Sequence, residues 1–172
     1  MLVKTYSAAV MGLEAIAVTI EISMTRGAML HLSGLADTSV RESYDRIKAA
    51  LYNNGYKMPV ADLTINLSPA DIKKEGSGYD LPLAVGILAS IENLKSDRLK
   101  DYMLVGELGL DGRLQPVRGA LPIAIKARAD KYKGLIVPKQ NIREAAVVNN
   151  LEVYGMESLV DVIHFFNGTK TF

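Results

Sequence analysis

Residues that could do chemistry are concentrated in Lys73–Leu88, which reads KKEGSGYDLPLAVGIL. Ser77 lies between Gly76 and Gly78, and a serine presented in this way can act as a nucleophile if a histidine or lysine base lies within reach. The sequence does not show which side chains come within reach of Ser77. The candidate functional residues of this loop are Lys73, Lys74, Glu75, Ser77 and Asp80.

The glycines of the loop match neither common phosphate-binding pattern. A Walker loop, G-x-x-x-x-G-K-[ST], rings phosphates with backbone N–H groups, and Gly76 and Gly78 lie too close together for it. The dinucleotide pattern G-x-G-x-x-G also fails, because Leu81 stands where the third glycine belongs. We therefore expect no nucleotide or other cofactor site in this loop.

A structural role for the loop competes with a chemical one. Asp80 is a good N-cap residue, with Leu81 as the first helical residue and Pro82 tolerated in the first turn, where N–H groups lack helical partners. We expect the Asp80 carboxylate to accept a hydrogen bond from the Leu83 N–H. Apolar residues then cover nearly all sides of the helix, which predicts that it is buried. We favour this interpretation over the nucleophile.

A second group of charged residues surrounds a predicted hairpin at Asp111-Gly112. Carboxylates gathered there could bind a metal ion or act in acid–base chemistry. Exposed ion pairs on a solvated hairpin are the commoner arrangement, and each contributes little. The residues of this candidate hairpin surface are Glu107, Asp111, Arg113 and Arg118.

A third group is basic. With Tyr132 as a stacking platform it could bind nucleic acid. More often, lysine and arginine in the last turn of a helix complement the helix dipole, and we favour that interpretation. The residues of this candidate basic patch are Lys126, Arg128, Lys131 and Lys133.

The composition limits the class of protein. Of the 172 residues 49% are apolar, which is enough for a substantial core, and the net charge of +1 gives no overall attraction to nucleic acid. The absence of cysteine excludes disulfides and cysteine-based zinc sites, and His31 and His164 show no metal-binding spacing. With no signal peptide and no membrane-length apolar run, we expect a cytoplasmic protein with no membrane partner.

The N-terminal third predicts strands followed by a helix. Ala15–Ser23 alternates apolar and polar residues, and a turn at Gly12 closes a hairpin with Val3–Val10. A third strand is expected over Ala28–Leu35. The next helix should begin with a capping box of Ser39 and Glu42 and end at Asn53–Gly55. Its expected buried stripe consists of Val40, Ile47, Ala50 and Leu51. Its expected solvent-exposed (wet) side consists of Arg41, Glu42, Asp45, Arg46 and Lys48.

The remaining pattern alternates strands and helices. Strands are expected at Asp62–Pro69, Asp101–Leu108, Gly134–Pro138 and Leu151–Gly155, and helices at Asp80–Asn93, Arg118–Tyr132, Asn141–Val148 and Ser158–Phe166. No linker or composition break divides the chain. The sequence therefore predicts a single α/β (α+β) domain over residues 1–172.

Several of these stretches together resemble one family. They include GLADTSVRESYDRIKAAL (Gly34–Leu51), NLSPAD followed by DLPLA (Asn66–Ala84), GELGLDGRLQPVRGALPIAIKA (Gly106–Ala127), LIVPKQN (Leu135–Asn141) and VYGMESLVDVIHFFNG (Val153–Gly168). This set resembles the N-terminal domain of magnesium-chelatase-like (ChlI/ComM-type) AAA+ ATPases over nearly the whole chain.

The resemblance implies a fold similar to the Lon protease domain and to the second domain of ribosomal protein S5. In Lon-type peptidases a serine opens the helix that corresponds to the one after Asp80, and a lysine lies in the helix after the GE hairpin. In this sequence the position of that serine falls at or beside Gly78 and Tyr79, and the position of that lysine falls near Leu121. The Ser/Lys pair therefore does not carry over. A peptidase that uses Ser77 with Lys73, Lys74 or Lys126 remains the main alternative.

The resemblance also implies a larger parent protein. Members of the family bind ATP and Mg²⁺ in a module that follows this domain, assemble as ring homo-oligomers and, in the ComM group, act on branched DNA during recombination. We therefore expect a non-catalytic domain with an AAA+ module downstream of residue 172. It would support ring assembly and engagement of DNA or a protein partner, and a stand-alone DNA-binding module is a second alternative.

Overall fold

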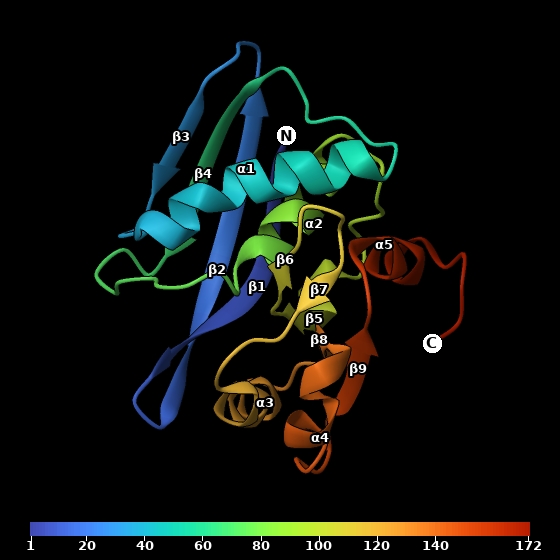
Figure 1. Cartoon of the computed structure of the whole chain (residues 1–172). Coiled ribbons are helices and arrows are strands. Elements are labelled where there is room, and N and C mark those ends of the chain that lie inside the picture. Colours follow the sequence, from blue (N-terminus) through green and yellow to red (C-terminus); the bar gives the residue numbers. More distant parts are fainter.

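Alternating residues near the N-terminus build the first hairpin of the largest sheet, as the computed structural model of residues 1–172 shows (Figure 1). Strands β1 (Leu2–Met11) and β2 (Glu14–Thr25) pair in antiparallel register from Leu2 opposite Ser23 to Met11 opposite Glu14. Gly12 makes the turn with a φ of 63°, a conformation that favours glycine. Strand β4 (Asp62–Ser68) pairs antiparallel with β2, and β3 (Leu30–Ser33) pairs parallel with β4.

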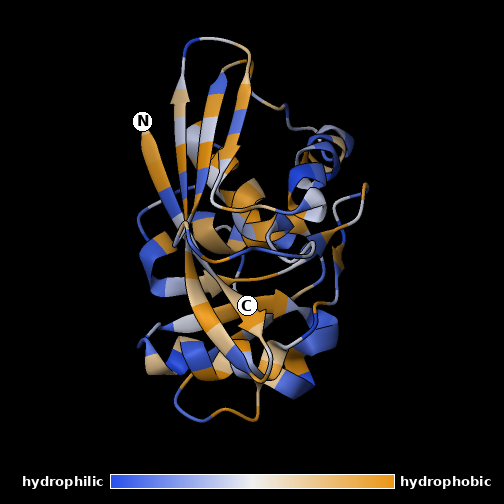
Figure 2. Ribbon diagram, turned by 90° about the vertical axis from the view of Figure 1, so that its left-hand side faces the viewer, coloured by the Kyte–Doolittle hydropathy of each residue, from blue (hydrophilic) through white to orange (hydrophobic).

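Two helices cover one face of this four-stranded sheet. Helix α2 (Asp80–Ser90) packs against β1 and β2, and α1 (Thr38–Asn53) packs against α2 (Figure 1). All residues of α2 are buried, which agrees with its apolar colouring in the middle of the molecule (Figure 2). The close approach of α2 to β2 depends on Gly86, because a Cβ there would lie 2.3 Å from the Ile22 Cδ1 atom.

The C-terminal half forms a smaller parallel sheet in the order β5-β8-β9. A 3-10 turn (Leu99–Asp101) leads into β5 (Tyr102–Leu104), and β8 (Gly134–Pro138) and β9 (Glu152–Met156) follow. Between β5 and β8 lie the hairpin of β6 (Glu107–Leu108) and β7 (Leu114–Gln115) and helix α3 (Ala120–Ala129). The chain closes with α4 (Ile142–Ala145) and α5 (Leu159–Asn167).

Two apolar clusters form the core, and strand β1 contributes to both. Val3 and Ala9 belong to the larger cluster, which contains α1, α2 and the four-stranded sheet together with α5 and residues of β5 and β8 such as Leu104 and Ile136. Ala8 belongs to the smaller one, formed with α3, β5 and β8. Because neighbouring residues of a strand point to opposite faces, β1 lies between the two clusters, and β5 and β8 do so as well.

The mixed α/β fold and the order of elements confirm the sequence-based expectation, and several boundaries correct it. The capping box of Ser39 and Glu42 is wrong: Asp37 is the N-cap of α1 and accepts from the Val40 N–H at 2.9 Å. Helix α3 begins at Ala120, because Gly119 has a left-handed φ of 78°. The helix expected over Asn141–Val148 is reduced to α4, after a 3-10 turn at Lys139–Asn141.

No α-helix in the chain combines the length and the apolar composition that crossing a bilayer demands.

We predict that Gly86→Ala destabilises the protein by about 1–2 kcal/mol, because crowding against the fully buried Ile22 outweighs the gain in helix propensity. Urea unfolding of the purified variant measures this change. Ile22→Val removes the Cδ1 atom that the new methyl group would meet. In that background the same Gly86→Ala change should be neutral or stabilising, and equal destabilisation in both backgrounds would contradict the packing described here.

Candidate functional site

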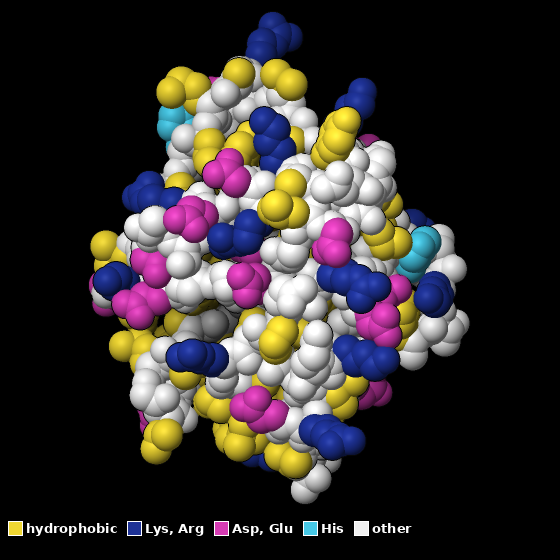
Figure 3. All heavy atoms as spheres, in the orientation of Figure 1, with side chains coloured by type: hydrophobic (Ala, Val, Ile, Leu, Met, Phe, Trp, Pro, Cys, Tyr) yellow, Lys and Arg dark blue, Asp and Glu magenta, His cyan; other side chains and the backbone are white.

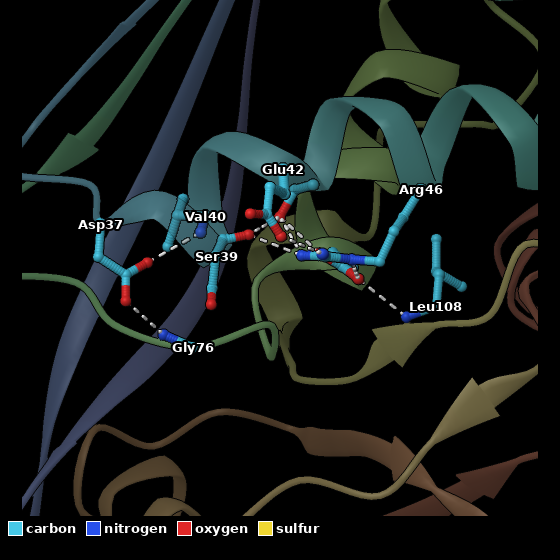
Figure 4. A network of polar contacts seen from close by, with 9 residues as sticks. Asp37, Ser39, Val40, Glu42, Arg46, Gly76 and Leu108 are labelled. Atoms are coloured by element: carbon cyan, nitrogen blue, oxygen red, sulfur yellow. Dashed lines mark hydrogen bonds and ion pairs between the residues drawn. The ribbon is translucent and has the colours of Figure 1, made fainter.

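The carboxylate of Asp80 is fully buried and joins three elements of the fold. Its Oδ1 accepts from the Ser43 hydroxyl at 2.5 Å and from Arg46 Nη2 at 3.0 Å. Its Oδ2 accepts from Arg46 Nε at 2.7 Å and from the Leu108 N–H at 3.0 Å. The two parallel Arg–carboxylate bonds form a bidentate pair, the stronger geometry for such groups. Helix α1, the start of α2 and strand β6 thus meet at one ion pair (Figure 4).

Asp80 therefore does not cap α2 in the way that the sequence predicts. Asp80 is the first helical residue, and the Leu83 N–H bonds to the Tyr79 carbonyl at 3.0 Å instead of the Asp80 carboxylate. A buried carboxylate requires compensation of its charge, and the Arg46 guanidinium supplies more of it than a backbone N–H. The hydrogen bond to Asp80 in turn raises the pKa of Arg46.

Arg46 was expected on the wet side of α1, and this expectation is also wrong. Its side chain is only 18% exposed, because it reaches over α1 toward Asp80. Ser43, which is buried beside it, lies on the apolar stripe between Val40 and Ile47. Ser43 is thus a polar residue on an apolar stripe, about one turn before Arg46. This pattern was the signal in the sequence for a buried polar contact of Arg46.

The loop before α2 is held by backbone hydrogen bonds on both sides. The Lys74 N–H donates to the Leu35 carbonyl at 2.9 Å, and the Gly76 N–H donates to Asp37 Oδ2 at 3.2 Å (Figure 4). Across the molecule, the Gly106 N–H donates to the Gly78 carbonyl at 2.9 Å. The loop is therefore tied both to the segment preceding α1 and to the connection between β5 and β6.

Within this loop the lysines do not lie ready to activate Ser77. The buried Lys74 ammonium donates to the Pro69 carbonyl, and burial lowers the pKa of Lys74. Lys73 forms an exposed ion pair with Glu75 at 3.4 Å. Ser77 is half-buried, its carbonyl accepts from the Asp80 N–H at 3.1 Å, and no hydrogen bond joins its hydroxyl to a lysine.

A cleft of about 600 Å³ opens beneath the N-terminal end of α1, where the surface is hollowed (Figure 3). It brings together Glu75 and Ser77 of the loop with Glu107 and Arg118 of the candidate hairpin surface. The other two hairpin residues, Asp111 and Arg113, do not line the cleft and face each other at the exposed hairpin tip at 4.0 Å. Asp37, Ser39 and Tyr79, which line the cleft, were not among the candidates from the sequence.

The wall of the cleft opposite the loop is fixed by a buried asparagine. Asn141 Oδ1 accepts from the Val117 N–H and Asn141 Nδ2 donates to the Val117 carbonyl, each at 2.9 Å. This pair of bonds holds the Pro116–Arg118 segment in place beside Ala8, Val10 and Ile123. The lining of the cleft thus combines apolar side chains with polar and charged ones.

The candidate basic patch lies at the C-terminal end of α3 and just beyond it. Lys126 pairs with Asp130 at 3.2 Å, whereas Arg128 and Lys131 are exposed and form no ion pair. Tyr132 is half-buried and packs against Tyr6 with the ring centroids 6.0 Å apart, and burial raises its pKa to about 12. The Tyr132 ring is therefore already engaged with another aromatic ring of the protein.

No three acidic or histidine side chains of the chain come together in a group that could hold a metal ion.

The sequence of this mixed α/β domain matches a known protein family. A family model described as "Subunit ChlI of Mg-chelatase" matches residues 20–141, and the chain belongs to this family. The chain is 42% identical over 166 residues to the competence protein ComM of Haemophilus influenzae, covering 96% of this chain and 32% of that protein. It is 39% identical over 164 residues to the YifB protein of Escherichia coli, covering 95% and 32%.

A weaker similarity connects the chain to the DNA repair protein RadA of Haemophilus influenzae, with 25% identity over 152 residues that cover 81% of this chain and 32% of that protein. The chain spans about a third of the length of the relatives it matches. The family and these similarities confirm the resemblance to the magnesium-chelatase-like (ChlI/ComM-type) family inferred from the sequence.

We predict that Asp80→Asn destabilises the protein by about 3–5 kcal/mol, because it removes the charge that compensates Arg46 and places an amide N–H₂ against donors. Urea unfolding followed by circular dichroism measures the change. Glu42→Gln is the control: Glu42 lies 3.7 Å from Arg46, its side chain is 59% exposed, and its loss should alter stability by less than about 1 kcal/mol.

Adding Arg46→Met to Asp80→Asn should restore part of the lost stability, since no uncompensated guanidinium then remains. A double variant that is less stable by the full sum of the single changes would contradict the coupling of these two residues.

Proposed function

We propose that this chain is a non-catalytic, Lon-like N-terminal domain of a magnesium-chelatase/ComM-like AAA+ ATPase. In this proposal a module downstream of residue 172 binds ATP and Mg²⁺, and the present domain supports assembly of the parent protein into a ring and its engagement of DNA or a protein partner. Family membership over most of the chain, combined with its span of about a third of the relatives, supports this arrangement.

The proposal that the domain is non-catalytic rests on the hydrogen bonding and charge at the start of α2. A nucleotide phosphate at a helix N-terminus needs free backbone N–H groups. Here the Asp80 N–H bonds to the Ser77 carbonyl at 3.1 Å, the Leu81 N–H bonds to the Gly106 carbonyl at 3.0 Å, and Pro82 has no N–H. The buried Asp80 carboxylate adds negative charge at the same place. The residues of this chain therefore do not fit a phosphate group here.

The peptidase alternative meets a similar difficulty. A serine nucleophile needs a base in hydrogen-bonding reach. Lys74 donates to Pro69, and Lys126 pairs with Asp130 on α3, so each of these lysines already has a partner other than Ser77. This geometry supports a binding or assembly role for the domain over a hydrolytic one.

The end of α3 is the surface that we propose for contact with DNA. Arg128, Lys131 and Lys133 are all exposed there, so three cations lie within six residues without an acidic partner within 4 Å. Relatives of the chain include proteins named for competence and for DNA repair. Because the net charge is only +1, any attraction to DNA has to come from such a local group.

Purified residues 1–172 should hydrolyse no ATP and cleave no casein above a mock purification, because the start of α2 offers no free phosphate donors and no lysine is bonded to the Ser77 hydroxyl. Phosphate release and peptide fragments are the measurements. The full-length parent protein, assayed alongside, should hydrolyse ATP. Casein cleavage that Ser77→Ala abolishes would establish the peptidase alternative and overturn the proposal.

The charge reversal of Arg128, Lys131 and Lys133 to glutamate should abolish DNA binding by the full-length parent, measured by fluorescence anisotropy. Binding by the unaltered protein should weaken steeply between about 50 and about 200 mM salt, as phosphate contacts require. A matched reversal of the exposed Arg26, Lys57 and Lys95 serves as the control and should leave binding unchanged. Equal loss in both triple variants would argue against α3 as the DNA-binding surface.

A further inference from the structure

The cleft beneath α1 contains an almost fully buried side chain whose polar end is unused. Tyr79 is only 3% exposed and lines the cleft. Its hydroxyl forms no hydrogen bond within the chain and keeps some contact with solvent. Because Tyr79 lines the cleft, the hydroxyl meets solvent there. A buried phenol without a partner is unfavourable unless water or a ligand completes its hydrogen bonding.

The charged side chains that line the cleft are mostly acidic. Asp37, Glu75 and Glu107 line the cleft against the single guanidinium of Arg118. Asp37 accepts from the Val40 and Gly76 N–H groups, and Glu75 pairs with Lys73. Glu107 forms no ion pair within 4 Å and no side-chain hydrogen bond, and it is only half-buried, although the Arg46 guanidinium attracts it from a greater distance. Its carboxylate oxygens can therefore meet a ligand. Burial, followed by the charges of Asp37 and Glu75, raises the pKa of Tyr79.

The walls of the cleft are apolar between these polar groups. They are formed by Ala8, Val10, Val105, Pro116, Val117 and Ile123. A ligand that fits both parts therefore has an aliphatic stem and a cationic end, as the side chains of arginine and lysine do. A volume of about 600 Å³ is ample for one such side chain and the atoms next to it.

We propose that this cleft binds an alkyl guanidinium or alkyl ammonium group, with Glu107 as its charge partner and the Tyr79 hydroxyl as a further acceptor. The same chemistry is presented by a basic side chain of a polypeptide and by a free small cation. This site is independent of the DNA-binding surface on α3 and of the ATP-binding module, so the two proposals can fail separately.

The ¹⁵N NMR spectrum of residues 1–172 provides the test. The probe is the peptide acetyl-Ala-Ala-Arg-Ala-Ala-amide, and its matched analogue contains uncharged citrulline in place of arginine. We expect saturable shifts of the Gly76, Gly78 and Glu107 amides with the arginine peptide and binding at least about tenfold weaker with citrulline, since a charge-assisted bond is lost.

Two nearly isosteric variants test the assigned residues. Glu107→Gln should weaken binding of the arginine peptide about tenfold, and Tyr79→Phe should weaken it several-fold without unfolding the protein. Glu157→Gln, at an exposed carboxylate paired with Lys139 and outside the cleft lining, is the control and should leave the affinity unchanged.

Butylguanidinium, used as a second probe, distinguishes the two sources of the cation. Binding as tight as that of the peptide supports a free small cation, and clearly weaker binding supports a side chain on a polypeptide partner. No shifts at Gly76, Gly78 and Glu107 with either probe, equal binding of the citrulline peptide, or an unchanged affinity in Glu107→Gln would each overturn the proposal.

Discussion

The bidentate pair of Arg46 and Asp80 is the interaction on which the arrangement of this domain depends. Both partners come from helices whose other contacts are mostly apolar, although the start of α2 also bonds to Gly106 and to Thr5. Apolar contacts constrain the rotation and axial position of a helix less sharply than directional bonds do. The bidentate pair fixes the rotation and the axial position of α1 against α2, because two N–H groups of a planar guanidinium must face two carboxylate oxygens. The additional bond to the Leu108 N–H extends this control to β6, and so to one wall of the cleft.

The elements were largely predictable, because the local patterns that specify them agree with their tertiary surroundings. The alternation over Ala15–Ser23 and the glycine at position 12 defined the β1–β2 hairpin, and the all-round apolar α2 could only be a buried helix. The capping of α1 was assigned wrongly because Asp37 and Ser39 are both good N-cap residues. The choice between them came from the Gly76 N–H, a donor 39 residues away in sequence.

The candidate site was less predictable, because it depends on which loops meet. The sequence identified Glu75, Ser77, Glu107 and Arg118 in two separate groups, and only the fold joins them. The same groups also contained Asp111 and Arg113, which the hairpin carries away from the cleft. The segments that form the cleft are each held by hydrogen bonds to a different part of the chain, so its shape exists before any ligand arrives and binding would require little ordering.

Strand β1 is placed between the two apolar clusters, with Val3 and Ala9 on one side and Ala8 on the other. Neither cluster can lose this strand without exposing apolar surface in both. Because the two clusters share β1, β5 and β8, the domain is expected to melt as one cooperative unit. A force pulling at the N-terminus would act first on a strand that both clusters share, so attachment at that end would load both clusters at once.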